Sequence, residues 1–404
     1  MARGKHRLPT PVRLLAAAAA VLTVGGIVIA TGTASAHDER SAAGSSGLSS
    51  TAAGGQDRGD GEGKGNRGKR DKGKKGDKDK KDKGNKVKGN EGRGNQDRGN
   101  QDQDAEQFPG RDQAGGPFRN DFINIANVSP NVEEPRLRRN ASTGSFTSVC
   151  GTNEEGHRNS DNFMVAPGKV NGAQHVHDYV GNLSTNAFST DESLNAADTT
   201  CAKEDKSTYF WPVLRDTRKQ GDDALVDGGG LDGNFGEILQ PTSVNLQFRG
   251  NPTSQVTAMP EGLALITGDA KAATNGDTNA KVAWTCAGFE DRVTTKYPLC
   301  PPGSQLTRIL DFPSCWDGKN LDSADHRTHI VFPKRNGSCG KGFVAVPQLR
   351  MTLTYQQPRG RGFALDSFPE QKHDPITDHA DFMNMMPEEL MTTAVNCINS
   401  GQNC

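Results

Sequence analysis

Beyond residue 117 the chain consists of short hydrophobic runs separated by polar turns. Gly, Pro, Asn and Asp gather between the runs, as in APGKVNG and DGGGLDG. Such a rhythm of short β-favouring runs and turn residues is typical of an antiparallel β-sandwich. The pattern predicts strands at residues 163–165, 174–180, 209–214, 243–248, 263–266, 281–286, 308–312, 329–332 and 349–355.

One helix is expected at the C-terminal end of the chain. Pro387 suits a first helical position, and Leu390, Ala394 and Ile398 recur every four residues on one helical face. We therefore predict a mainly β fold: an antiparallel, jelly-roll-like β-sandwich with long loops, short helices and a C-terminal helix. Residues 117–404 suit a single globular domain, because sandwiches of this size are often undivided.

The first 36 residues have the pattern of a signal peptide. Basic residues precede an apolar run at 14–30, and Ala34-Ser35-Ala36 follows as a cleavage signal, which makes His37 the expected mature start. An uncleaved anchor is the alternative, since about 17 apolar residues lie at the short limit for spanning a bilayer. We expect cleavage, a secreted or extracytoplasmic location and no stable membrane span afterwards.

Residues 37–116 form a charged spacer of Gly, Lys, Asp, Asn, Arg and Gln, with almost nothing to bury. Such a composition predicts a disordered tether. The net charge of the chain is −1 although the spacer is basic, so the remainder is acidic and no motif suggests nucleic acid. The spacer either reaches anionic cell-wall polymers or membrane headgroups, or separates parts without a partner. Both interpretations stay open.

All eight cysteines lie beyond the spacer and none forms a CxxC pair. An even number in an exported chain indicates disulfides rather than zinc. Sequence alone allows about 105 pairings. We expect chain neighbours to pair: Cys150 with Cys201, Cys286 with Cys300, Cys315 with Cys339, and Cys397 with Cys404.

Six histidines of this histidine-poor chain occur as three pairs, in HVH, DHRTH and KHDPITDH. On a strand, His175 and His177 would share one face, which suits a metal ion or a polar pocket. His326 and His329 would share a face only in a helical or 3₁₀ turn, where Asp325 could orient one ring. Neutral imidazoles bind metals and shuttle protons, although buried histidines also serve as hydrogen-bond hubs.

The sequence resembles a secreted domain-of-unknown-function family, number nineteen ninety-six. The resemblance rests on FPSCWDGKNLDSADHRTH, with HVHDYVGN upstream and DHADFMN downstream. It implies no proven reaction, and it favours a polysaccharide as the ligand. It implies signature positions at His177, Trp211, Pro212, Cys315, Trp316, Asp317, Gly318, Asp322, Asp325, His326, His329, His379 and Asp381.

This chain departs from the family pattern at two places. Gly342-Phe343-Val344 follows Cys339 where the family usually has His-Pro-Val, which would matter if that histidine were a ligand. The family often has Ser at position 175, so the resemblance implies that His175 is not required.

The candidate catalytic residues are His177, Asp325, His326, His329, His379 and Asp381, and the candidate metal ligands are His177, His326 and His329. Trp211, Trp316 and Tyr209 are candidate sugar platforms, although core packing is the commoner use of such rings. One divalent metal ion is the candidate cofactor. His37 is a poor ligand, because a disordered spacer cannot hold it against the other histidines.

Two functions follow from these residues. The first is an extracellular polysaccharide-active enzyme that uses the His/Asp cluster, with a metal-activated water or with general acid and base catalysis. The second is a non-catalytic wall-associated or carbohydrate-binding protein whose histidines are structural. The carboxylates of Asp317 and Asp322 add a glycosidase possibility that depends on their separation.

Overall fold

Strand β16 (Gln348–Tyr355) shows how the sequence builds the core. The computed structural model describes residues 115–404, and in this strand every second side chain is buried, from Leu349 to Tyr355. The polar residues between them face outward, as the pleat of a strand requires. Strand β16 therefore has one core face and one solvated face.

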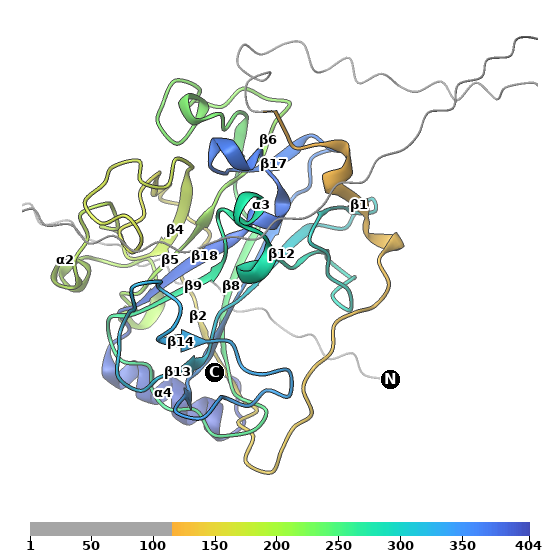
Figure 1. Cartoon of the computed structure of the whole chain (residues 1–404). Coiled ribbons are helices and arrows are strands. Elements are labelled where there is room, and N and C mark those ends of the chain that lie inside the picture. Colours follow the sequence, from red (N-terminus) through yellow and green to blue (C-terminus); the bar gives the residue numbers. More distant parts are fainter. Residues whose placement is uncertain (1–114) are drawn as a thin grey trace, which may run out of the picture. The chain divides into compact units, whose positions relative to one another are not determined.

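Strand β16 lies at the centre of a five-stranded antiparallel sheet, which we call the first sheet (Figure 1). Helix α4 (Glu388–Asn399) contacts two of its strands, β2 and β8. The first sheet has the order β10 (Trp284–Cys286), β12 (Leu306–Asp311), β16, β8 (Ser243–Arg249) and β2 (Ser145–Ser148).

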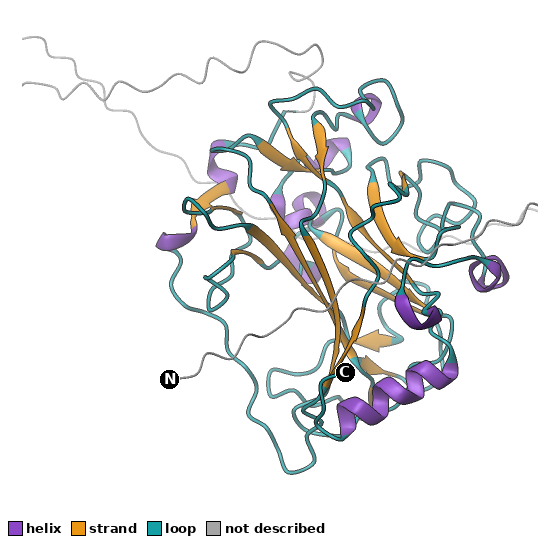
Figure 2. Cartoon of the chain, turned by 180° about the vertical axis from the view of Figure 1, so that it is seen from behind, coloured by secondary structure: helices purple, strands orange, loops and turns teal. Residues whose placement is uncertain are grey.

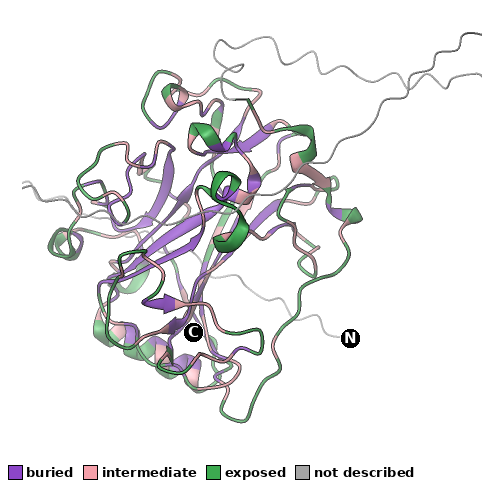
Figure 3. Cartoon of the chain, viewed as in Figure 1, coloured by how far each residue is buried: buried purple, intermediate pink, exposed green. Residues whose placement is uncertain are grey.

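The second sheet is also five-stranded and antiparallel, and its four longer strands are buried on both faces. One face packs against the first sheet, and loops cover the other. Figure 3 accordingly shows buried residues throughout the centre of the molecule. Its order is β3 (Arg158–Asn159), β4 (His177–Gly181), β5 (Thr208–Pro212), β18 (His379–Asn384) and β9 (Leu263–Gly268).

The two sheets share one hydrophobic core. Phe382 of the second sheet lies with its ring centroid 5.9 Å from that of Phe248 in the first, and Tyr209 stacks on Phe382 at 4.9 Å. Sheets that bury their inner faces against each other in this way form a sandwich.

Smaller elements surround the sandwich (Figure 2). One three-stranded antiparallel sheet consists of β14 (Ile330–Val331), β13 (Cys315–Trp316) and β15 (Val344–Ala345). A second consists of β17 (Phe363–Leu365), β6 (Leu214–Asp216) and β7 (Glu237–Leu239). A parallel pair is β1 (Phe122–Asn124) with β11 (Tyr297–Leu299), and the short helices are α2 (Asp191–Ala196) and α3 (Ala272–Asn275).

The predicted fold class is confirmed: the described chain is mainly β, with several antiparallel sheets, short helices and a C-terminal helix. Eight of the nine predicted runs overlap a strand. Residues 163–165 instead lie in a turn whose Phe163 and Met164 pack on the outer face of the second sheet. The sequence prediction missed strand β18.

The four disulfides join the predicted neighbours: Cys150–Cys201, Cys286–Cys300, Cys315–Cys339 and Cys397–Cys404. Within residues 115–404, no helix is long and apolar enough to cross a membrane. The predicted signal peptide, at 1–36, and the spacer, at 37–116 apart from its last two residues, lie outside the described part of the chain.

A buried ion pair crosses the sandwich. Arg308 of β12 donates from Nη2 to Oδ1 of Asp378 at 2.5 Å and from Nη1 to the Pro212 carbonyl at 2.9 Å. Both charged side chains are at most 1 % exposed. Because Asp378 precedes β18 and Pro212 ends β5, Arg308 of the first sheet holds two neighbouring strands of the second.

We expect Arg308→Met to lower the free energy of unfolding by about 3–5 kcal/mol, because the Asp378 carboxylate would stay buried without its partner. Urea unfolding followed by tryptophan fluorescence measures the change. Arg350→Met is the matched control: Arg350 pairs with Asp311 and is 26 % exposed, so its loss should cost about 1 kcal/mol or less. Equal effects of the two substitutions would contradict this account.

Candidate functional site

The outer face of the second sheet carries two rows of side chains under its cover of loops. Strand register places His177 opposite Pro212, with His379 opposite Gly268 on the other side of β18. The next row runs from Tyr179 through Phe210 to Asp381 and Ile266. Histidines and one carboxyl group therefore lie among aromatic and aliphatic neighbours.

Three imidazoles converge at this face. The Nε2 atom of His175 lies 3.0 Å from Nε2 of His177 and 3.2 Å from Nε2 of His379. All three residues are at most 4 % exposed. We call His175, His177 and His379 the histidine triad.

Backbone carbonyls determine the tautomers of two triad rings. Nδ1 of His177 lies 3.0 Å from the Asp161 carbonyl, and Nδ1 of His379 lies 2.8 Å from the Thr377 carbonyl. A carbonyl only accepts, so each Nδ1 carries the hydrogen and each Nε2 of a neutral ring keeps its lone pair. Both lone pairs then point at His175, whose own Nδ1 has no hydrogen-bond partner.

Burial holds the triad in the neutral, metal-binding form. It lowers the pKa of His177 to about 3, and the nearby His379 adds repulsion against a proton. Burial also lowers the pKa of His379, and it lowers that of His175 well below its usual value, where His177 and His379 add to the effect. Neutral imidazoles with free Nε2 atoms are the form that binds metal ions.

The triad fits one divalent transition metal ion. Nitrogen ligands at about 2.0–2.1 Å from a tetrahedral zinc ion lie about 3.3 Å apart, close to the two measured separations. Within residues 115–404, no fourth His, Cys, Asp or Glu joins the triad. A second cluster, Cys150 and Cys201 with Asp205, is unsuitable because its sulfurs form a disulfide.

Buried ion pairs hold the backbone on both sides of the triad. The Val176 N–H, between two triad residues, donates to Asp366 at 3.2 Å, and Arg215 binds both oxygens of that carboxylate. On the other side, Asp378 next to His379 is held by Arg308. A metal site needs this kind of support around its ligands.

Asp381 lies two residues from His379 on the same face of β18. Its carboxyl accepts from the Asn162 side chain at 3.2 Å. Burial raises the pKa of Asp381 to about 7, and the positive charge of Arg327 opposes this rise. A carboxyl group with such a pKa can take up or release a proton near neutrality.

The DHRTH segment does not join the triad. Nε2 of His329 donates to the Ala264 carbonyl at 2.7 Å, and Nδ1 of His326 lies 2.8 Å from Asp322. Asp325 closes the turn by accepting from the backbone and hydroxyl of Thr328 and from Ser323, and these bonds lower its pKa. Thus His177 lies in the candidate metal set while His326 and His329 lie outside it.

The remaining sequence candidates have structural contacts. Trp211 and Tyr209 are fully buried in the core, so neither presents a face to a sugar. Trp316 is half-buried and donates from Nε1 to the Asn320 carbonyl. Asp317 accepts from the backbone of residues 319 and 320, and His373 hydrogen-bonds the Leu365 carbonyl, away from the triad.

The candidate residues chosen from the sequence did not include His175, Arg327 or Asn162, which the structure places at or near the triad and Asp381. The H-x-H spacing placed His175 beside His177 on an expected strand; the two rings do meet, although the strand begins only at His177 and His175 lies in the preceding bend. Arg327 and Asn162 come from loops, so no periodic signal in the sequence linked them to Asp381.

We expect the metal-free protein to lose stability as the pH falls from 6.5 towards 3. In that window the histidines of the unfolded chain bind protons, whereas the buried triad rings stay neutral. The free energy of unfolding therefore falls by about 1.4 kcal/mol per pH unit for each such ring. Urea unfolding in the presence of a chelator, repeated across this window, measures the slope. His177→Gln should reduce the slope, and an unchanged slope would show that His177 already titrates normally in the fold.

Comparison with known proteins agrees with the resemblance seen in the sequence. No curated protein and no solved structure matches this chain. The family model described as "Domain of unknown function (DUF1996)" matches residues 163–385, more than half of the chain. That range includes the histidine triad, Asp381 and the DHRTH segment. The chain therefore belongs to the DUF1996 family.

Proposed function

We propose that this protein is an exported metalloenzyme that acts on an extracellular or cell-wall polysaccharide at the histidine triad. The observation that carries the proposal is the convergence of three buried Nε2 atoms at 3.0 and 3.2 Å, with two rings oriented by backbone carbonyls. The single Nε2–H of a neutral His175 cannot fully satisfy both Nε2 lone pairs that face it, whereas one cation between the three rings could.

Export is supported by the signal-like N-terminal sequence and by the disulfides. All eight cysteines pair, which is typical of an oxidising compartment. The basic spacer of the sequence would then lie outside the cytoplasm and close to anionic wall polymers.

The chemistry would divide between the triad and Asp381. When bound, a divalent ion held by three imidazoles supplies Lewis acidity and lowers the pKa of a water ligand to about 7. The neutral triad rings would hold the ion through Nε2. Asp381, with its pKa near 7, would hold or release a proton at its carboxyl oxygen on the same sheet face.

A polysaccharide ligand is supported by the outer surface of the first sheet, which lies on the side of the sandwich away from the triad. A groove of about 1110 Å³ runs over it, and its lining combines apolar side chains with hydroxyl, amide and charged ones that include Thr307, Thr352, Thr354 and Gln348. Hydroxyl-rich polymers bind through many such hydrogen bonds. The groove exceeds the roughly 300–1,000 Å³ of common small-molecule sites.

A structural metal site is the second candidate function. It is favoured by burial, because the triad residues are only 0–4 % exposed. In that case the ion would stabilise a wall-associated or carbohydrate-binding protein and would not take part in catalysis.

The secreted full-length protein should bind one equivalent of zinc or another divalent transition metal ion. We expect His177→Ala and His379→Ala to lose at least about tenfold in affinity, because each removes a ligand. His326→Ala is the matched control, since that ring bonds only Asp322, and it should bind metal normally. Elemental analysis and calorimetry with the metal ion measure both quantities.

Activity on cell-wall and plant polysaccharides, assayed by released reducing ends, separates the two candidate functions. Turnover that is lost in His177→Ala and in Asp381→Asn supports the enzyme. Normal metal binding and metal-dependent stability without turnover of any polysaccharide would favour the structural site. A protein that binds no divalent transition metal ion, or whose metal binding survives both triad substitutions, would refute the metal centre.

A further inference from the structure

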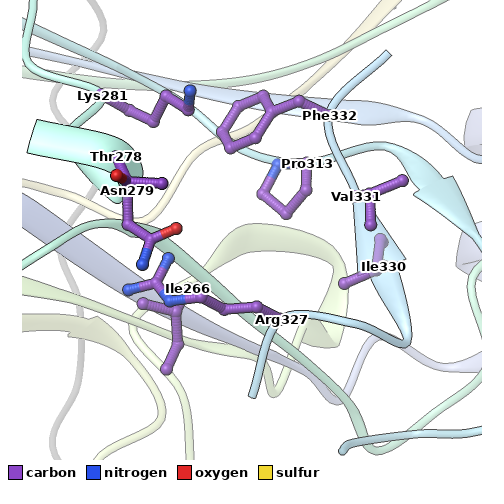
Figure 4. Close-up of a pocket in the computed structure, with 9 residues that line it drawn as sticks. All are labelled: Ile266, Thr278, Asn279, Lys281, Pro313, Arg327, Ile330, Val331 and Phe332. Atoms are coloured by element: carbon purple, nitrogen blue, oxygen red, sulfur yellow. The ribbon is translucent and has the colours of Figure 1, made fainter. Parts of the chain in front are cut away.

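A small cavity lies between the DHRTH segment and the loop after α3. Its volume is about 200 Å³, and its lining contains two cations and no acidic residue. Figure 4 shows Lys281 beside Phe332 on one side, with the Arg327 guanidinium beside the Asn279 amide on the other. The cavity therefore combines positive charge with a polar amide.

Both cationic side chains of this cavity have N–H groups left to donate to a ligand. Nη2 of Arg327 donates to the Gly268 carbonyl at 2.7 Å, and Nζ of Lys281 lies 5.0 Å from the centre of the Phe332 ring. Neither side chain forms an ion pair with a described residue. A planar guanidinium with free N–H groups matches a carboxylate, and an ammonium group adds charge.

The rest of the lining is apolar. Pro313 and Ile330 are buried, and Phe332 is half-buried. An apolar wall beside cationic groups suits a sugar ring that bears a carboxylate, because the ring face packs on carbon while the acid meets the cations. A volume of about 200 Å³ leaves room for one small unit.

The cavity adjoins both parts of the proposed site. Lys281 and Phe332 also line the groove on the first sheet. On the other side, Arg327 bonds Gly268, which is the register partner of His379. The carboxyl of Asp277, next to Thr278, belongs to the groove and not to the cavity lining.

We infer that this cavity is a subsite for a uronate residue of an acidic polysaccharide, bound through its carboxylate by Arg327 and Lys281. The inference rests on the proposed function for the polymer, and it specifies the substrate class. Arg327 would place the acidic sugar next to the strand that carries His379 and Asp381.

Calorimetric titration of the full-length, chelator-treated protein tests the subsite, with tri-galacturonate, its methyl ester and acetate as probes. We expect tri-galacturonate to bind at least about tenfold more tightly than the other two, because only it joins a carboxylate to a sugar. Higher salt should weaken its binding, since mobile ions screen charges within about 8–10 Å.

Arg327→Gln and Lys281→Gln should each raise the Kd for tri-galacturonate about tenfold while leaving the weak binding of the methyl ester unchanged. Lys281 is exposed, so its substitution leaves the fold intact even if Arg327→Gln perturbs the Gly268 contact. Lys169→Gln, at an exposed lysine away from the cavity lining, is the matched control and should bind normally.

Equal binding of acid and ester, or an unchanged Kd in both variants, would overturn the subsite. Acetate binding as tight as tri-galacturonate would overturn the sugar assignment. Because the chelated protein is used, these outcomes are independent of the metal centre. Metal binding and turnover of a neutral polysaccharide would preserve the proposed function while the uronate subsite fails.

Discussion

The contact between Arg308 and Asp378 is the interaction on which the rest of the structure depends. It places two opposite charges inside the sandwich, where neither is more than 1 % exposed. Burial of an unpaired charge costs several kcal/mol, so each partner requires the other. The same guanidinium also binds the Pro212 carbonyl, and therefore sets strands β5 and β18 relative to the first sheet. His379 lies on β18, and His177 lies on β4 opposite Pro212 of β5.

The outer face of the second sheet is consequently a rigid support for polar groups in an apolar setting. Loop residues Phe163 and Met164 pack on this face, and burial lowers the pKa of each triad histidine and raises that of Asp381. Backbone carbonyls orient two of the rings without adding charge. Neutral imidazoles and a carboxyl group with a raised pKa therefore result from one cause, the exclusion of solvent from this face.

Strands with one solvated face were predictable, because alternation in segments such as 349–355 reports the pleat directly. Strand β18 was not, because HADFMN contains no β-branched residue and carries three polar side chains that the fold nevertheless buries. The closeness of His175 and His177 was expected from a strand period, but His175 lies in the bend before β4, so a local turn brings the two rings together. The separation of His329 from the triad was not expected, because it depends on a turn in which His326 has a φ of 54° and on a bond to Ala264. The charge of Arg327, from that turn, acts on Asp381 only because the fold brings the two segments near each other.

X-ray absorption spectroscopy of the protein loaded with one equivalent of zinc tests the central claim most directly, because it reports the ligands of the ion. The structure predicts three imidazole nitrogens at about 2.0–2.1 Å and one further light-atom ligand. His177→Ala should lose one imidazole contribution, and His326→Ala should leave the spectrum unchanged. A spectrum dominated by carboxylate oxygens, or one that His177→Ala does not alter, would contradict a metal centre on the histidine triad.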